Sequence, residues 1–268
     1  MAPLPVPTKA DTQILSEATK SIDSSFQVLY FAVHSRGELI RAILNSAGSK
    51  WEELAPDSVA IGLTMFEQCY LLNDTGMASS KGSNPFGVLP VVYETTSNGA
   101  VLELAESAAI ERYLAKKFDL YGKNEYEQHK VEEYLSSTDD ALLAHSIKVV
   151  RAVDIPPEKR VEQTNKFYAE EVLKFITIHE AHLEKNGSNG HYVGQSTTLP
   201  DLKTALFIDR VFYLRPSGTD EVPISAEKSP NLWKLRETVN NHPSLAEWRK
   251  SQRYQELETA TRRLFKFN

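Results

Sequence analysis

The sequence predicts two domains, an α/β domain with a small sheet followed by an all-helical domain. The strand signals come early in the chain. Residues 26–31 are aromatic and β-branched, and Asn98-Gly99 separates the apolar runs 88–93 and 101–104. An Asn-Gly pair between two apolar runs is a strong hairpin signal, because both residues tolerate positive φ. Beyond residue 124 every strong pattern has helical periodicity, which favours a second unit built from helices alone.

Local signals order the elements of the first domain. A helix over residues 38–47 follows the first strand, with apolar residues at helical spacing and Gly48 at its C-terminal end. Residues 51–54 suit a second short strand, and residues 107–117 suit a helix after the hairpin. Residues 55–84 carry mixed helix and loop signals, so we treat them as an insert.

The second domain is predicted to hold four helical segments, approximately 125–150, 157–185, 199–214 and 232 to the C-terminus. Thr198 followed by Asp201 has the spacing of a capping box, with Asp where Glu or Gln is usual. The expected organisation is a flexible arm over 1–24, an α/β domain over 25–119 and a helical domain over 124–268.

Composition restricts the classes of function. The 268 residues carry 30 Lys and Arg against 36 Asp and Glu, a formal charge of −6. Such a chain has no broad positive field for phosphates, so we expect no nucleic-acid partner. No apolar run approaches the ~20 residues that span a bilayer, and the proline-rich start is unlike a signal peptide. We therefore expect no membrane partner.

Cys69 is the single cysteine of the chain. One cysteine excludes an intramolecular disulfide, a CxxC redox pair and a thiolate-cluster metal site. It also favours a reducing compartment, so a cytoplasmic location is expected.

Several motifs follow one another along the chain: Tyr30-Phe31, Arg36-Gly37-Glu38-Leu39-Ile40-Arg41, residues 85–90, residues 106–114, Thr138-Asp139-Asp140, Val193-Gly194 and Trp248-Arg249. Their order resembles the glutathione transferases, in particular the sigma-like group with a catalytic tyrosine. The resemblance covers residues 26–249 except the insert. It implies a thioredoxin-like N-terminal domain, an all-α C-terminal domain, glutathione as co-substrate, no metal and a two-fold homodimer.

Thiol chemistry explains the role that the resemblance gives to Tyr30. The thiolate is the nucleophile, and a free thiol with a pKa of ~8.5 is only slightly ionised near neutral pH. Lowering that pKa by ~2 units takes ~2.7 kcal/mol, and one hydrogen bond to a charged group supplies ~1.5–3 kcal/mol. The resemblance makes the Tyr30 hydroxyl the donor, whereas pattern alone favours a core tyrosine. Ser35 is the alternative donor, and its structural alternative is a helix N-cap.

Further residues are expected to bind the tripeptide. Arg36 resembles a residue that reaches toward the thiol, and its alternative is a surface ion pair with Glu38 or with another acidic residue. The resemblance also implies a cis bond between Leu89 and Pro90, which would expose backbone groups of the Val88–Pro90 segment to pair with the cysteinyl backbone.

The γ-glutamyl end of glutathione is expected near Glu106 and Ser107, where the last strand enters a helix. Helix N–H groups and the Ser107 hydroxyl can bind a carboxylate, and Glu106 can accept from the ammonium. For Ser107 an N-cap is the alternative. Asp140 resembles a residue that reaches the partner subunit's glutathione across a dimer interface, although adjacent carboxylates on a helix are usually solvated.

Several features limit the resemblance. The insert replaces the region that would contact the glycyl carboxylate, where Lys81 is only a guess. Ile147 stands where prostaglandin isomerases of this family resemble one another in carrying an aromatic residue, which disfavours that reaction. His179 and His182 could share a helix face, but no third ligand accompanies them, so a core or solvated role is favoured over a metal site.

The expected function is conjugation of glutathione to a hydrophobic electrophile, in detoxification or in secondary metabolism. Two alternatives stay open: a non-catalytic ligand carrier or scaffold with the same fold, and a glutathione-dependent isomerase.

Overall fold

A computed structural model describes residues 16, 19–20, 23–54, 86 and 88–267, and the chain divides into two units, residues 1–118 and 119–268. The predicted arm over 1–24 lies largely outside the described residues, and the insert over 55–84, with Cys69 and Lys81, lies wholly outside them.

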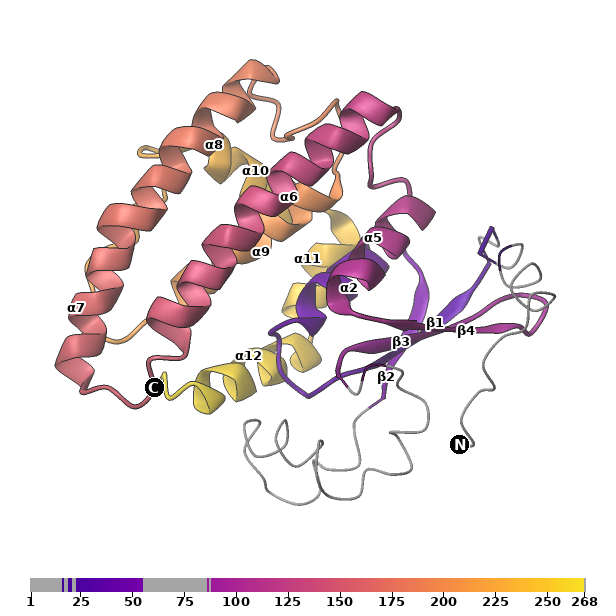
Figure 1. The fold of residues 1–268 in the computed structure, drawn as a ribbon, viewed down its shortest axis with the longest axis horizontal. Coiled ribbons are helices and arrows are strands. Elements are labelled where there is room, and N and C mark those ends of the chain that lie inside the picture. The colour runs from indigo at the N-terminus through magenta and orange to yellow at the C-terminus, as the bar shows by residue number, and fades with distance from the viewer. Residues whose placement is uncertain (1–15, 17–18, 21–22, 55–85, 87, 268) are drawn as a thin grey trace. The chain divides into compact units, whose positions relative to one another are not determined.

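The first unit contains a mixed four-stranded sheet with the order β2-β1-β3-β4. The first two strands along the chain pair in parallel, and the other neighbours pair antiparallel. The helices α2 and α5 lie side by side over one face of this sheet (Figure 1). The strands are β1 (Ser25–Leu29), β2 (Lys50–Leu54), β3 (Val91–Thr95) and β4 (Val101–Ala105), and the helices are α2 (Gly37–Ser46) and α5 (Ser107–Lys117).

Apolar burial fixes this arrangement. On β1 the side chains alternate, so that Phe26 and Val28 are 2% and 1% exposed while their neighbours face outward. Ile40 and Ile43 of α2 are completely buried, as is Leu114 of α5. The α/β prediction is therefore confirmed, with strand and helix types as expected.

Two details of the hairpin differ from the prediction. The strand β3 begins at Val91 rather than at residue 88, because Pro90 has no N–H to give to a sheet ladder. In the turn, Gly99 alone has positive φ, at 84°. Asn98 contributes through its side chain instead, whose Oδ1 accepts from the Ala100 N–H at 3.2 Å.

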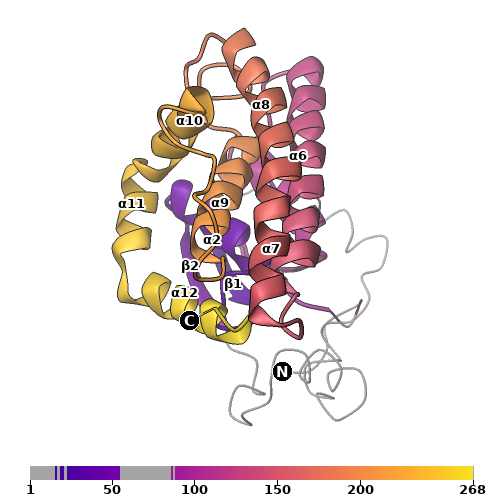
Figure 2. The same ribbon diagram turned by 90° about the vertical axis from the view of Figure 1, so that its left-hand side faces the viewer.

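The second unit is all-helical. In Figures 1 and 2 the helix α6 runs alongside the continuous helical segment formed by α7, η3 and α8. The long helix α9 packs against both α6 and α10. The elements are α6 (Glu125–His145), η2 (Ser146–Val150), α7 (Pro157–Phe167), η3 (Tyr168–Val172), α8 (Leu173–Lys185), α9 (Leu199–Tyr213), α10 (Pro230–Asn240), α11 (Pro243–Lys250) and α12 (Gln252–Leu264).

The last predicted helix is wrong as one continuous segment. It is three helices, with Pro243 in the first turn of α11 and Ser251 as the cap of α12. The Ser251 hydroxyl accepts from the Tyr254 N–H at 3.2 Å. The capping box ahead of α9 is confirmed, since the Thr198 N–H and hydroxyl both donate to Asp201, at 2.7 and 2.9 Å.

His179 lies in the core of the helical unit. Its Nδ1 is 2.5 Å from the Tyr192 hydroxyl and its Nε2 is 3.0 Å from Ser137 Oγ, while its ring stacks on Phe175. Burial lowers the pKa of His179 to about 3, so the ring is neutral near neutral pH. The expected core role is confirmed for this histidine, and His182 contacts the Tyr134 hydroxyl at 3.3 Å.

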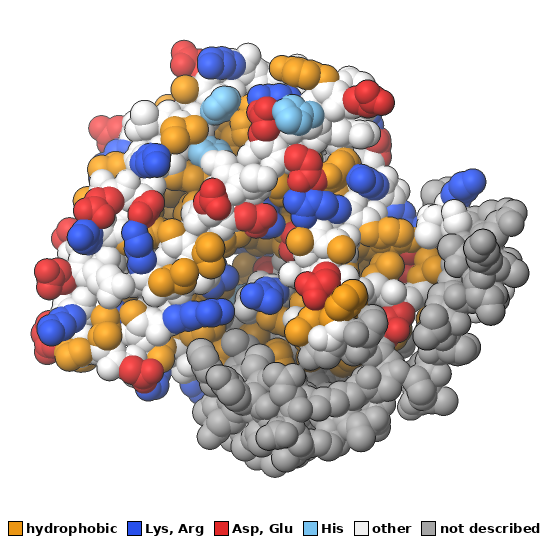
Figure 3. All heavy atoms as spheres, in the orientation of Figure 1, with side chains coloured by type: hydrophobic (Ala, Val, Ile, Leu, Met, Phe, Trp, Pro, Cys, Tyr) orange, Lys and Arg blue, Asp and Glu red, His pale blue; other side chains and the backbone are white. Residues whose placement is uncertain are grey.

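Within the described part of the chain, no group of His, Cys, Asp or Glu side chains is arranged to hold a metal, and no helix is long and apolar enough to cross a membrane. Acidic and basic side chains are interspersed over the face drawn in Figure 3.

Candidate active site

The register of the sheet places segments that are distant in the sequence at the same end of three neighbouring strands. Val91, the first residue of β3, lies opposite both Leu29 and Ala105, which are the last residues of β1 and β4. Tyr30 therefore follows β1, Pro90 precedes β3 and Glu106 follows β4 at the same end of three adjacent strands. Because neighbouring strands lie ~4.8 Å apart, the row spans ~10 Å.

Tyr30 is positioned against the first turn of α2. Its side chain is 6% exposed, and its hydroxyl oxygen accepts from the Arg36 N–H at 3.3 Å. Arg36 is the N-cap residue of α2, so the phenol group lies beside the positive end of the helix dipole. An anion next to this hydroxyl would be stabilised by both groups.

Gly37 allows this close approach. A Cβ at position 37 would lie only 2.5 Å from Cδ1 of Tyr30 and 3.0 Å from Nη1 of Arg41. The missing side chain lets the tyrosine ring pack directly on the backbone of the first helical turn.

Neither structural alternative proposed for this turn is observed. The N-cap of α2 is Arg36, and no side chain caps it, so Ser35 does not serve as a cap. Ser35 is half-buried with φ of 36°, a conformation that costs a non-glycine residue ~1–3 kcal/mol and occurs preferentially at functional sites. Glu38 contacts His34 at 2.6 Å and Arg41 at 3.6 Å, while Arg36 itself is exposed.

Arg41 holds the loop that carries the candidate catalytic residues. Its side chain is 1% exposed and its Nε donates to Glu53 at 2.6 Å. Its Nη1 donates to the Val33 carbonyl at 2.9 Å, and its Nη2 to the Phe31 carbonyl at 3.3 Å. Its guanidinium carbon also lies 5.9 Å from the centre of the Tyr30 ring.

Sequence reasoning missed the role of Arg41 and Glu53. A usable signal existed, because Arg41 interrupts the apolar side of a helix whose residues from Gly37 to Leu44 are all buried. A buried arginine needs an acidic partner and further acceptors. The pattern did not indicate which acid on a neighbouring strand that partner would be.

The bond between Leu89 and Pro90 is cis, as expected. Val88 is 42% exposed and Leu89 is half-buried, so the segment leading into β3 lies at the surface. Pro90 itself is buried. These residues follow the prediction in place and backbone conformation; their contact with a ligand stays a prediction.

The N-terminus of a second helix, α5, lies at the same end of the sheet. Glu106 is the N-cap of α5, is exposed and has φ of 67°, and no side chain caps the helix. Ser107 is therefore the first residue of α5 rather than its cap. The Ile110 N–H already bonds the Glu106 carbonyl at 2.9 Å, whereas the N–H groups of the preceding turn have no partner within the helix. This end of α5 suits a carboxylate.

The remaining predicted residues belong to the helical unit. Asp140 is exposed on α6, whereas its neighbour Asp139 pairs with Lys203 at 2.5 Å. Ile147 is 56% exposed in η2. Asp140 belongs to the other unit. The other predicted residues lie at one end of the sheet: Tyr30, Ser35, Arg36, Val88, Leu89, Pro90, Glu106 and Ser107.

Comparison with known proteins shows which proteins the chain is similar to. Residues 145–252 match the family model described as glutathione S-transferase, C-terminal domain. The chain is 27% identical over 224 residues to the glutathione S-transferase class-mu 28 kDa isozyme of Schistosoma mansoni, and the match covers 83% of this chain and 93% of that protein. The chain is therefore similar to glutathione S-transferases over most of its length. The thioredoxin-like first unit and the helical second unit correspond to the two domains of the glutathione S-transferase fold.

Two further proteins are similar to this chain. The sigma class enzyme of Fasciola hepatica superposes with a TM-score of 0.64 at 22% identity, covering 85% of this chain and 96% of that one, a likeness of fold. Human hematopoietic prostaglandin D synthase is 23% identical over 229 residues, covering 84% of this chain and 94% of that protein. The proteins to which the chain is similar thus include a prostaglandin D synthase as well as glutathione S-transferases.

Proposed function

We propose that this protein is a sigma-like glutathione transferase. It binds glutathione at this end of the sheet in its first unit and conjugates it to a hydrophobic electrophile. The observation that carries the proposal is the meeting of Tyr30, Pro90 and Glu106 at one end of three paired strands. Each contributes a group that the tripeptide needs.

Tyr30 is the proposed catalytic residue. Its hydroxyl donates to the glutathione sulfur while its oxygen accepts from the Arg36 N–H, and that second hydrogen bond strengthens the first by polarising the phenol. A charge-assisted hydrogen bond of ~1.5–3 kcal/mol corresponds to a thiol pKa lowered by ~1–2 units. At the upper end of that range the pKa falls from ~8.5 to ~6.5, and most of the bound sulfur is then thiolate at neutral pH. Ser35, beside the same helix end, is the second candidate donor.

The other parts of the tripeptide bind to the residues at the same end of the neighbouring strands β3 and β4. Backbone groups of Val88 and Leu89 pair with the cysteinyl part, like an added strand. Ser107 and the N–H groups of the first turn of α5 bind the γ-glutamyl carboxylate, and Glu106 accepts from its ammonium. The exposed guanidinium of Arg36 adds positive charge near the sulfur.

The proposal extends to a cytoplasmic homodimer in which Asp140 reaches the glutathione of the partner subunit, with a role in detoxification or secondary metabolism. Exposure of Asp140 beside a neighbour already paired with Lys203 supports its availability to a second chain. The single Cys69 is consistent with a reducing compartment.

A glutathione-dependent isomerase is the second candidate, favoured by the likeness to the human synthase. An isomerase regenerates glutathione, whereas a transferase consumes it, so the free thiol concentration before and after turnover separates the two. A non-catalytic carrier would bind glutathione but would catalyse neither conjugation nor isomerisation.

The test combines calorimetric titration of glutathione with conjugation of an activated aryl halide, in which the C–S bond forms and halide leaves. Tyr30→Phe should retain glutathione binding and lose ~10–100-fold in kcat/KM. Tyr93→Phe is the matched control, because it removes the same hydroxyl from a residue of the same sheet, where that group contacts Glu103 at 3.5 Å. Full activity in Tyr30→Phe together with its loss in Ser35→Ala would move the catalytic role to Ser35.

A further inference from the structure

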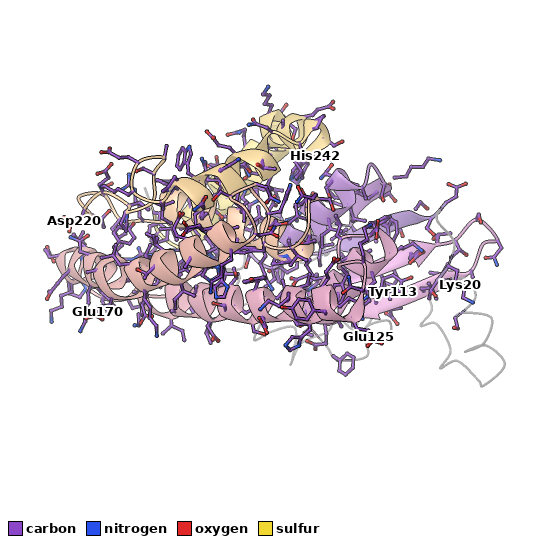
Figure 4. The ribbon with its side chains drawn as sticks, turned by 90° about the horizontal axis from the view of Figure 1, so that it is seen from above. Lys20, Tyr113, Glu125, Glu170, Asp220 and His242 are labelled. Atoms are coloured by element: carbon purple, nitrogen blue, oxygen red, sulfur yellow. The ribbon has the colours of Figure 1, made fainter. Side chains whose placement is uncertain are left out.

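The helical unit contains a polar pocket formed entirely by residues 212–262, outside the segments assigned to glutathione. It lies where α9 ends, between the following loop and α12, with a volume of about 320 Å³. That size is within the ~300–1,000 Å³ range of small-molecule sites. The loop runs on to Asp220, which is labelled toward the left-hand end of this unit in Figure 4. The lining includes Phe212, Arg215, Ser217, Gly218, Thr219 and Arg262.

Two guanidinium groups share this pocket. Arg262 donates from Nη1 to the carbonyl of Tyr213, the last residue of α9, and Arg215 donates from Nη1 to the Asp220 carbonyl at 3.4 Å. Both acceptors are neutral, and each contact uses one of the five N–H donors of a guanidinium. Across the described ranges, neither arginine forms an ion pair with an acidic side chain. Two positive charges are therefore held at one pocket.

Two acidic residues follow the pocket loop. Glu221 pairs with Lys228 at 2.8 Å, and this hydrogen bond, together with the smaller effect of the Arg215 charge, lowers the pKa of Glu221. Asp220 is exposed, and its N–H donates to Asn165 Oδ1 at 2.9 Å. The loop is thereby tied to α7.

The remaining lining suits the other half of an amphiphilic ligand. Ser217 presents a hydroxyl group, whereas the Thr219 hydroxyl donates to the Pro216 carbonyl at 3.1 Å, and Gly218 between them has φ of 87°, which tightens the turn. Phe212 supplies an aromatic surface and is fixed by an edge contact to Trp233, with ring centres 6.4 Å apart. Planar guanidinium forks bind tetrahedral oxyanions in bidentate geometry, which an isolated lysine cannot do.

We propose that this pocket is a second ligand site, which binds an oxyanion carried on an aromatic group, an aryl phosphate being the simplest member of the class. Arg215 and Arg262 bind the phosphate oxygens, the Ser217 hydroxyl donates a further hydrogen bond, and the ring lies against Phe212. The site is independent of the proposed transferase chemistry, since it uses none of the residues assigned to glutathione.

The experiment is calorimetric titration of the full chain with phenyl phosphate in a phosphate-free buffer, with S-methylglutathione present at saturation to occupy the glutathione site. Inorganic phosphate tests the oxyanion alone, and phenol tests the ring alone. We expect one phenyl phosphate per chain with a Kd below about 1 mM, weaker binding of inorganic phosphate, and no binding of phenol.

Arg215→Gln and Arg262→Gln should each weaken phenyl phosphate binding about tenfold or more, since each removes a charge-assisted bidentate contact. Arg263→Gln is the matched control, because it removes the same charge from the exposed neighbour on α12. Ser217→Glu, at an exposed position of the loop, places a negative charge at the pocket without disturbing α9 and should abolish binding. Circular dichroism checks that each variant is folded.

No saturable binding by the native chain would overturn the proposal. So would equal weakening by Arg263→Gln, which would indicate only diffuse charge attraction, or retention of binding in Ser217→Glu. Equal affinity for inorganic phosphate and phenyl phosphate would remove the aromatic half of the assignment.

Discussion

Replacing Arg41 by lysine should damage both the stability of the first unit and the chemistry at Tyr30. The substitution keeps the positive charge but replaces a planar fork with a single ammonium. The fork of Arg41 joins three partners at once, the Glu53 carboxylate at 2.6 Å and the carbonyls of Val33 and Phe31 at 2.9 and 3.3 Å. An ammonium on a shorter stem cannot bridge all three.

The magnitude follows from the partners left behind. If the substituted ammonium keeps the ion pair with Glu53, two carbonyl oxygens of the loop lose a charged donor in a region where the side chain of Arg41 is 1% exposed. The Phe31 carbonyl keeps the Val33 N–H at 2.8 Å, whereas the Val33 carbonyl is left without the Arg41 donor. A buried polar group left without its partner costs ~1–3 kcal/mol, so the expected loss in unfolding free energy is ~1–3 kcal/mol. The freed loop carries Ser35 and Arg36 and contacts Tyr30, so kcat/KM should fall ~10–100-fold even where the variant is folded.

Urea denaturation followed by far-ultraviolet circular dichroism measures the first effect, and the aryl halide assay well below the unfolding midpoint measures the second. Ultraviolet absorption of the bound thiolate against pH adds a direct readout, in which the sulfur pKa should rise by ~1 unit. Arg112→Lys on α5 is the matched control, since Arg112 donates to the backbone carbonyl of Ala108 within its own helix.

The reasoning would be refuted by an Arg41→Lys protein with native stability and an unchanged thiolate titration. Loss of stability without any change in the titration would keep Arg41 as a structural residue and remove its influence on Tyr30.

Three further predictions follow from the site and from the helical unit. Ser107→Ala should weaken glutathione binding ~3–10-fold by calorimetry, with the sulfur pKa unchanged, because one hydroxyl contact to the γ-glutamyl carboxylate is lost while the α5 N–H groups remain; an altered sulfur pKa would contradict this assignment. His179 has a pKa of about 3 in the fold against an ordinary value of 6.5, so the unfolded chain takes up its proton first as the pH falls. The unfolding free energy should therefore decline from about pH 6.5 toward pH 3, by up to ~1.4 kcal/mol per pH unit from this group, and His179→Gln should show a shallower decline in urea denaturation at pH 7 and pH 5. Asp140→Asn should raise the Kd for glutathione only where sedimentation shows a dimer, whereas Asp139→Asn should alter stability through its Lys203 partner instead.

Much of the fold could be predicted because its signals are local. The helix expected over 107–117 is α5 as observed, and the hairpin appears where Asn98-Gly99 indicates it. Failures occur where a local pattern continues through a break. The final helical pattern runs through Pro243 and Ser251, although the backbone restarts at both positions. A periodic apolar pattern does not show whether its turns belong to one axis or to three.

The residues of the candidate site could be named from the sequence, whereas the residues that hold them in position could not. Tyr30, Glu106 and Ser107 could be named from motif order, but Arg41 and Glu53 were missed because their partnership joins a helix to a strand and leaves no spacing rule in the chain. The contact between the Tyr30 ring and Gly37 is likewise invisible until the helix is packed on the sheet.

The amino-acid sequence by itself determined the two-unit organisation, the strand and helix types and the residue kinds available for thiol chemistry, since these depend on periodicity, turn residues and composition. Only the tertiary structure decided that Leu29, Val91 and Ala105 share one register, and that the Tyr30 hydroxyl meets the backbone of the turn into α2. Pairing between strands and burial of charged groups depend on which surfaces meet, and the free energy of those contacts exists only once the chain is packed.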